Sequence, residues 1–238
     1  MGMAFADVLV HESNATAIII DKRDLPGGHW NTAYPFVTLH QPSAFYGVNS
    51  MTLGQNRIDS DGWNEGLYEL ATNSEVCHYF QRVMVEKLLP SGRIQFVPNA
   101  ELTSDGSVVS TVTGQVIELD AKKIVDATYM KVQVPAMRPP DFPVADGVSC
   151  VPVNGLPDMA GPNRSYVIIG AGKTGMDACL WLLGRGVDPK HIRWIMPRDS
   201  WLLNREFIQP FKLSERTATG FAHQMQAFAH APDVTELF

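Results

Sequence analysis

Residues 167–176 constrain the fold of this chain more than any other segment. They read Val-Ile-Ile-Gly-Ala-Gly-Lys-Thr-Gly-Met, an apolar run that ends in a complete Gly-x-Gly-x-x-Gly turn. In such a turn Gly170 permits the sharp reversal, Gly172 lets the backbone approach a pyrophosphate, and Gly175 lets helix and strand pack closely. The helix that follows offers unpaired N–H groups to anionic oxygens. The segment therefore predicts a dinucleotide site.

The residues around this turn support that interpretation. Residues 166–169 form a short apolar run typical of a buried strand, and residues 174–183 have helical apolar spacing. Gly184 and Gly186 can end the helix, and residues 192–196 indicate the next strand. Together they predict one βαβ unit. A glycine turn in an α/β domain without any ligand is the alternative.

The residue just past the second strand bears on which nucleotide is bound. An acid there bonds the ribose 2′-hydroxyl of NAD, whereas an arginine accommodates the 2′-phosphate of NADP. Arg198 occupies this position, and Lys173 and Thr174 lie in the turn itself, so the sequence favours NADP. Asp199 is adjacent and leaves NAD open, and a solvated loop charge is the alternative role for Arg198.

Composition narrows the class of protein. The chain has 238 residues, 45% hydrophobic and 18% charged, which is ordinary for a globular protein of one large or two small domains. The net charge is −6 and no basic run interleaves with aromatics, so we expect no nucleic-acid partner. We find neither an 18-residue apolar stretch nor a signal-peptide pattern, so we expect a cytoplasmic protein with no membrane association.

Cysteines and histidines suggest neither thiol nor metal chemistry. Cys77, Cys150 and Cys179 lie far apart and form no Cys-x-x-Cys, which disfavours a disulfide reductase. His223 and His230 can share a helix face but have no acidic or cysteine partner at ligand spacing. We therefore expect no metal site.

The start of the chain has a sequence pattern similar to that of the region around Gly175. Gly2 opens an apolar helical stretch over residues 3–11, and residues 15–21 then predict a strand with Asp21 at its tip. Asp21 lies nineteen residues after Gly2, close to the spacing of about 20 at which an acid binds ribose. The opening strand and the first two glycines of such a site are absent from the sequence.

This alignment places the start of the chain inside a Gly-rich turn. The missing strand is normally the central one of its sheet, so its neighbours would lack backbone partners. We interpret the segment as part of a fragment, the product of a late start codon or a degenerate copy. A simple helix–strand opening in another α/β order is the alternative.

The segment after Asp21 carries a resemblance to a known family. It reads Pro-Gly-Gly-His-Trp, in which Gly27 and Gly28 permit close approach of the backbone to a ligand, and Trp30 offers the ligand a flat apolar wall. A turn with a buried tryptophan is the alternative. A strand, an acid and Gly-Gly-x-Trp, followed downstream by Gly-x-Gly-x-x-Gly, resemble the two-dinucleotide flavoproteins over nearly the whole chain. These are the flavin-containing and Baeyer–Villiger monooxygenases and their relatives.

The resemblance implies that the first nucleotide fold binds FAD and the second binds NADPH. It implies that Asp21 contacts the FAD ribose, that Gly27, Gly28 and Trp30 line the path of the flavin, and that His40 or Gln41 donates hydrogen bonds to the isoalloxazine. An ordinary loop histidine is the alternative for His40. Residues 123–129 resemble the family strand that ends in Ala-Thr-Gly, with a tyrosine in place of the glycine.

The expected architecture is α/β, with Rossmann-like folds built on a mainly parallel three-layer sheet and incomplete at both ends. We expect an FAD-binding domain over residues 1–135, a proline-rich connector over 136–162 and a partial NAD(P)-binding domain over 163–238. We also expect helices at 74–89 and 219–231, a strand at 93–98 and a hairpin at 108–119. Phe221, Met225 and Phe228 share one helical face, for which core packing is expected.

The resemblance implies an FAD-dependent, NAD(P)H-using oxidoreductase, monooxygenase-like, acting on a small organic substrate. No residue is identified as a proton donor or base. A non-catalytic remnant that binds only NADP or serves as an interaction module is the alternative. A plain NADP-dependent dehydrogenase would leave the Gly-Gly-x-Trp segment unexplained.

Overall fold

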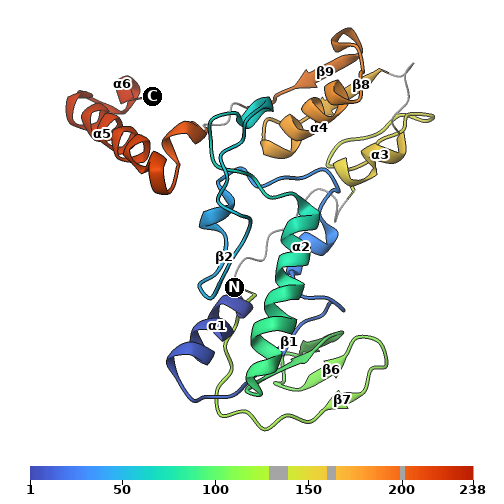
Figure 1. Cartoon of the computed structure of the whole chain (residues 1–238). Coiled ribbons are helices and arrows are strands. Elements are labelled where there is room, and N and C mark those ends of the chain that lie inside the picture. The colour runs from blue at the N-terminus through green and yellow to red at the C-terminus, as the bar shows by residue number, and fades with distance from the viewer. Residues whose placement is uncertain (129–138, 160–164, 199–201, 238) are drawn as a thin grey trace.

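The computed structural model describes residues 1–128, 139–159, 165–198 and 202–237 (Figure 1). The chain is a mixture of helices and short strands, which confirms an α/β composition in its coarse form. The described strands form four separate sheets of two or three strands, rather than one continuous sheet. Among the described residues, no helix combines the length and apolar character needed to cross a bilayer.

The N-terminal part is built around a parallel strand pair. Helix α1 (Gly2–Glu12) leads into β1 (Ala17–Ile20), which pairs in parallel with β4 (Ile94–Val97). Helix α2 (Asn73–Arg82) lies between them in the sequence and continues through π-type and 3-10 turns to residue 91. These elements match the predicted helix–strand opening, helix 74–89 and strand 93–98.

Helix α2 begins and packs as its sequence dictates. Thr72 and Glu75 form a capping box, in which each side chain accepts a hydrogen bond from the other's backbone N–H. Val76 of α2, with Val83 and Leu88 of the π-type turn that continues it, is fully buried in the core shared with α1 and β4. Tertiary burial of these side chains therefore stabilises α2 and its continuation.

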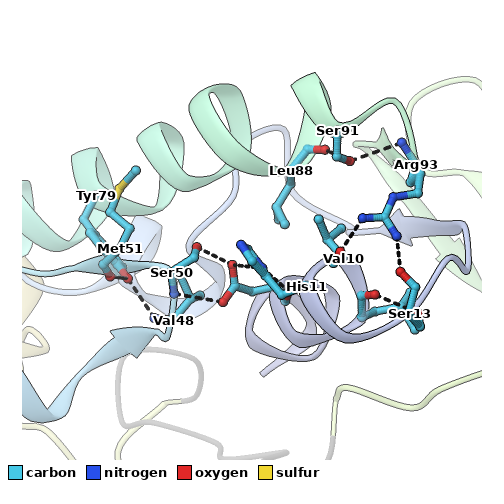
Figure 2. A network of polar contacts seen from close by, with 12 residues as sticks. Val10, His11, Ser13, Val48, Ser50, Met51, Tyr79, Leu88, Ser91 and Arg93 are labelled. Carbon is cyan, nitrogen blue, oxygen red and sulfur yellow. Dashed lines mark hydrogen bonds and ion pairs between the residues drawn. The ribbon is translucent and has the colours of Figure 1, made fainter.

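Polar contacts at both ends of α1 fix the helix against its neighbours (Figure 2). The Asp7 side chain is 1% exposed, and its carboxylate accepts hydrogen bonds from the Ser50 hydroxyl and, at 3.1 Å, from the Ser50 N–H. At the other end of α1, the Arg93 guanidinium donates to the carbonyls of Val10 and Ser13. The helix is thereby tied both to the turn at Ser50 and to the start of β4.

Two small antiparallel sheets complete the N-terminal part. Strands β2 (Gly47–Val48) and β3 (Met51–Thr52) form a hairpin whose backbone is linked to α2 by Tyr79. The Tyr79 hydroxyl accepts from the Val48 N–H at 2.7 Å and donates to the Met51 carbonyl at 2.6 Å. The second sheet contains three strands in sequence order, β5 (Ala100–Leu102), β6 (Val108–Ser110) and β7 (Val116–Ile117). It includes the predicted hairpin at 108–119.

The strand predicted at residues 123–129 is wrong where the structure describes it. Residues 123–128 form no strand, and Ile124 and Val125 are 67% and 54% exposed. Among the described residues no strand lies alongside to supply ladder hydrogen bonds, without which an apolar run does not become a strand. A Cβ built on Gly2 would lie 3.3 Å from the Ala127 Cβ, so the segment does pass the start of α1. Residue 129 lies outside the described residues.

The second part contains the βαβ unit that the sequence predicted. Strand β8 (Tyr166–Ile169) leads through the Gly-rich turn into α4 (Lys173–Gly184), and β9 (Ile192–Ile195) pairs with β8 in parallel. The predicted strands and helix are confirmed to within one residue at each end. Because β1 and β8 belong to different sheets, the chain does not form one undivided sheet.

The core of this unit lies between α4 and one face of the strands. Ala178 and Leu182 of α4 are 1% and 0% exposed and pack with Tyr166 of β8. Trp181 stacks on Phe36 of the N-terminal part, with ring centroids 5.0 Å apart and an interplanar angle of 23°. The short helix α3 (Leu156–Met159) contributes Leu156 to the same cluster. The domain connector predicted at 136–162 is thus partly packed where it is described.

The C-terminal helices lie apart from the βαβ unit (Figure 1). They are α5 (Ser214–His230) and α6 (Val234–Leu237). Core packing of one face of α5 was the prediction, and it is wrong: Phe221, Met225 and Phe228 are 64%, 62% and 58% exposed. The helix meets the described residues mainly at two preceding 3-10 turns, through the buried Gly220, so its apolar stripe is uncovered.

Candidate nucleotide site

The Gly-rich turn between β8 and α4 has a backbone that requires glycine at its first position. Gly170 has φ +124°, a region that residues with a side chain rarely adopt. Its N–H donates to the Ile195 carbonyl at 2.9 Å, and its own carbonyl accepts from the Trp194 indole at 2.7 Å. The reversal is therefore held against β9 through both the N–H and the carbonyl of Gly170.

The other two glycines differ in what surrounds them. A Cβ built on Gly175 would lie 2.6 Å from the Gly170 carbonyl oxygen, so a glycine is needed there for the helix to approach the strand. Gly172 has φ −77° and ψ 172°, which any residue adopts, and a Cβ there would meet no described atom within 4 Å. Nothing in the described protein thus explains a glycine at position 172. The space beside it is open for a ligand.

Lys173, the first residue of α4, has intramolecular partners. Its ammonium donates to the Thr38 carbonyl at 2.7 Å and forms an ion pair with Asp177, one helical turn further along. The Lys173 and Asp177 side chains are 29% and 16% exposed. The same Asp177 oxygen accepts a hydrogen bond from the Tyr34 hydroxyl at 2.7 Å. Residues 34–38 are therefore connected to the first turn of α4.

Tyr34 stays protonated in this cluster. Its side chain is buried against α4, and burial raises its pKa above the ordinary value. The hydrogen bond to the Asp177 carboxylate and the charge of that carboxylate raise the pKa further, while a hydrogen bond with the Thr174 side chain lowers it. Tyr34 is thus a hydrogen-bond donor to Asp177 at any pH at which the protein is ordinarily handled.

A second contact fixes the segment that contains His40 and Gln41. The Arg205 guanidinium donates to the His40 carbonyl at 3.1 Å and to the Asn64 side-chain oxygen at 3.0 Å. Burial lowers the pKa of Arg205, and the nearby Asp177 carboxylate opposes that effect. The His40 side chain is exposed and Gln41 is half-buried. Residues 34–41 are therefore anchored from α4 and from the C-terminal part.

The predicted ribose-binding acid lies at the carboxyl end of its strand. Asp21 follows β1 directly, its N–H extends the pairing with β4, and one carboxylate oxygen accepts from the Arg23 N–H at 3.0 Å. Arg198 lies three residues beyond the end of β9 and is exposed. Both residues lie where ligands bind in parallel α/β sheets. The structure gives no contact between Asp21 and the Gly-rich turn around Gly172.

The Gly-Gly-x-Trp segment is a tight turn over a buried indole. Gly27 and Gly28 have φ +122° and +59°, which accounts for both glycines. Trp30 is 8% exposed, and its indole N–H donates to the Tyr46 hydroxyl at 2.6 Å. Most of the flat surface predicted to face a flavin is therefore covered by the protein's own core.

Several residues that organise the site were missed by sequence reasoning. Asn31 donates through its side-chain amide to the carbonyls of Leu25, Pro26 and Gly28, which closes the glycine turn. Asp177 was recognisable from its spacing of four residues after Lys173, a spacing at which helical ion pairs form. No local pattern indicates the partners from residues 34–38, because they are distant in sequence.

A separate groove lies between the β2–β3 hairpin and α2. Its volume is about 470 Å³, and its lining includes Arg57, Glu69, His78 and Tyr79. None of the sequence-predicted site residues lines it. In the part of the chain that the structure describes, no group of three or more His, Cys, Asp or Glu side chains is arranged to bind a metal ion.

Comparison with known proteins gives relatives but no family. No protein-family model matches the chain. Uncharacterized proteins of Mycobacterium bovis (strain AF2122/97) and of Mycobacterium tuberculosis (strains CDC 1551 and H37Rv) are each 48% identical to it over 239 aligned positions. The match covers 100% of this chain and 44% of each relative, so the chain spans less than half the length of the curated relatives it matches.

Proposed function

We propose that the Gly-rich turn at residues 170–175 binds NADP(H), as the second nucleotide site of an FAD-dependent, NAD(P)H-using oxidoreductase. The reaction proposed is monooxygenase-like, on a small organic substrate. The observation that carries the proposal is the contrast within the turn. Gly170 and Gly175 are needed by the protein's own geometry, whereas Gly172 borders open space. A backbone that must approach a ligand accounts for a glycine at that position.

The chain's own residues suit a dinucleotide at this turn. Gly172 is the N-cap of α4 and supplies no side chain to cap the first N–H groups, which leaves them available to pyrophosphate oxygens. Arg198 is exposed at the end of β9, where it could pair with a 2′-phosphate. Rossmann-like organisation of the whole enzyme remains part of the proposal, and the β8–α4–β9 unit is what supports it.

The residues fit FAD only in part. Asp21 stands at the end of β1 where a ribose would be bound. His40 and Gln41 lie on a segment that is anchored beside the Gly-rich turn at residues 170–175. Trp30, which would line the path of the flavin, is 8% exposed and presents little surface to a ligand. When bound, the two cofactors together supply hydride transfer and oxygen activation, and the protein binds, orients and excludes water.

This partial fit favours a second candidate, a non-catalytic module that binds NADP without FAD. The two candidates share the site at Gly172 and differ only in whether flavin binds. Binding is measured by titrating the purified chain with NADPH and following nucleotide fluorescence. Flavin is measured by reconstitution with FAD, removal of free cofactor and absorption near the visible flavin band.

Each outcome of these two measurements has one meaning. Binding of NADPH together with retained FAD supports the oxidoreductase. Binding of NADPH without FAD supports the non-catalytic module. Failure to bind either NADPH or NADH at millimolar concentration overturns both candidates, because the Gly-rich turn would then have no nucleotide to explain Gly172.

A further inference from the structure

The ion pair between Lys173 and Asp177 connects two regions that are far apart in the sequence. Lys173 lies in the Gly-rich turn, where the sequence predicts a contact with nucleotide phosphate. Its ammonium instead contacts the Thr38 carbonyl and the Asp177 carboxylate. A lysine on the first turn of a nucleotide-binding helix can serve the ligand or the protein. The contacts in this structure favour the second role.

Four contacts of the cluster converge on one short segment. Tyr34 donates to Asp177 at 2.7 Å, and the Lys173 ammonium lies 5.9 Å from the centre of the Tyr34 ring. Lys173 also donates to the Thr38 carbonyl, and Arg205 donates to the carbonyl of His40. The segment therefore receives its polar anchors from α4 on one side and from the turn at Arg205 on the other.

We propose that the Lys173–Asp177 pair is a bridge that fixes residues 34–41 against the first turn of α4, and that Lys173 is a positioning residue rather than a phosphate ligand. The functional part of this inference rests on the proposed function, in which His40 and Gln41 contact the flavin and the turn at Gly172 binds the nicotinamide nucleotide. The bridge gives the two cofactor sites one fixed separation.

Energetic considerations agree with this assignment. Freeing the Lys173 ammonium for a phosphate would leave the partly buried Asp177 carboxylate without its cation and the Thr38 carbonyl without its donor. A charged group that loses its partner in a partly buried site is costly, because the desolvation penalty is no longer offset. The anion-binding capacity of the turn does not need the lysine, since the backbone N–H groups of α4 supply it.

The test separates the two roles of Lys173 by two readouts. The variants Lys173→Met, Asp177→Asn and the double variant are compared with the parent by hydrogen exchange of the peptide covering residues 34–41. The Leu39 amide, bonded to the Ala71 carbonyl at 2.8 Å, is the expected reporter. Local opening of a segment is what such exchange measures. NADPH affinity is measured on the same proteins at two salt concentrations.

The bridge predicts about tenfold faster exchange in either single variant, and no further increase in the double variant, because both remove one shared interaction. It also predicts that Lys173→Met changes NADPH affinity less than about threefold and leaves its salt dependence unchanged. Tyr34→Phe, which removes one contact of Asp177 without altering Lys173, is expected to accelerate the same peptide by a smaller factor.

The control is another helical ion pair at the same spacing. Arg82 and Glu86 are each 47% exposed, with a nitrogen–oxygen distance of 2.8 Å. Arg82→Met should leave exchange at residues 34–41 and NADPH affinity unchanged. Unchanged exchange at 34–41 in Lys173→Met, with NADPH affinity at least tenfold weaker, would overturn the bridge and make Lys173 a phosphate ligand. If the parent binds no NADPH, the proposed function fails, and the exchange measurement alone decides the bridge.

Discussion

Replacing Gly172 by alanine tests the proposed site without disturbing the fold. The position has φ −77° and ψ 172°, and an added Cβ meets no described atom within 4 Å. Alanine caps a helix less well than glycine, but it also reduces the entropy of the unfolded chain. These effects are each about 0.5–1 kcal/mol and opposite in sign. The free energy of unfolding of Gly172→Ala should therefore lie within about 0.5 kcal/mol of the parent.

Gly175→Ala provides the contrast. Its Cβ would lie 2.6 Å from the Gly170 carbonyl oxygen, a backbone atom that cannot move without shifting β8 or the start of α4. Overpacking of this kind costs about 1–3 kcal/mol, and the better helix propensity of alanine offsets about 1 kcal/mol of it. Gly175→Ala should therefore lower the free energy of unfolding, measured by denaturant titration, by up to about 2 kcal/mol.

Gly172→Ala, which should hardly change stability, should strongly weaken the binding of NADPH. A methyl group on residue 172 would occupy the path of the pyrophosphate and prevent at least one charge-assisted hydrogen bond, a loss of about 10–100-fold in NADPH affinity. Gly184→Ala, at the other end of α4 and equally open around its Cβ, is the matched control and should bind NADPH as the parent does. Parent-like NADPH affinity in Gly172→Ala would refute the argument from the open glycine.

Three further predictions concern stability and reactivity. Asp7→Ala should lower the free energy of unfolding by about 1–3 kcal/mol in denaturant titration, because the half-buried Ser50 N–H and hydroxyl lose a charged acceptor. Since the pKa of Tyr34 is raised on folding from an ordinary value near 10, its contribution is complete below pH 10 and is lost as pH rises above it. The parent should thus lose stability more steeply than Tyr34→Phe as the pH rises above 10, whereas below pH 10 the two should show the same pH dependence. Among the three thiols, Cys150 is exposed, whereas burial raises the pKa of the two half-buried ones. A thiol-reactive dye should label one site fast and two slowly in the native protein, and three equally in denaturant.

The part of the fold that sequence reasoning predicted well is the part whose determinants are local. The β8–α4–β9 unit is specified by a short apolar run, three glycines with distinct backbone needs and helical apolar spacing, all within about thirty residues. The capping box formed by Thr72 and Glu75 at the start of α2 is likewise a local feature, although the structure and not the sequence analysis revealed it. Such signals do not depend on which distant segment packs against them.

The predictions that failed depend on a partner that the local pattern does not contain. Residues 123–128 have the apolar composition of a strand, but a strand needs a neighbour with which to exchange backbone hydrogen bonds. Phe221, Met225 and Phe228 correctly indicate a helix with one apolar face, yet nothing in their spacing says whether that face is covered. In both cases the periodicity predicts the element, and only the structure shows its environment.

The proposed role of Lys173 also depends on residues that are distant in the sequence. The motif alone makes its side chain a phosphate contact, because the motif records only the residues of the turn. Its partners at residues 34–38 lie about 135 residues away in the sequence and become visible only in three dimensions. The glycine at 172 is informative for the opposite reason: the protein, seen in three dimensions, makes no demand on that position. At the middle position of a Gly-x-Gly-x-x-Gly turn, the close approach of a ligand accounts for a glycine that neither its own backbone nor its described neighbours need. Gly184 is equally open but lies outside the turn, so the comparison of Gly172→Ala with Gly175→Ala and Gly184→Ala tests that explanation directly.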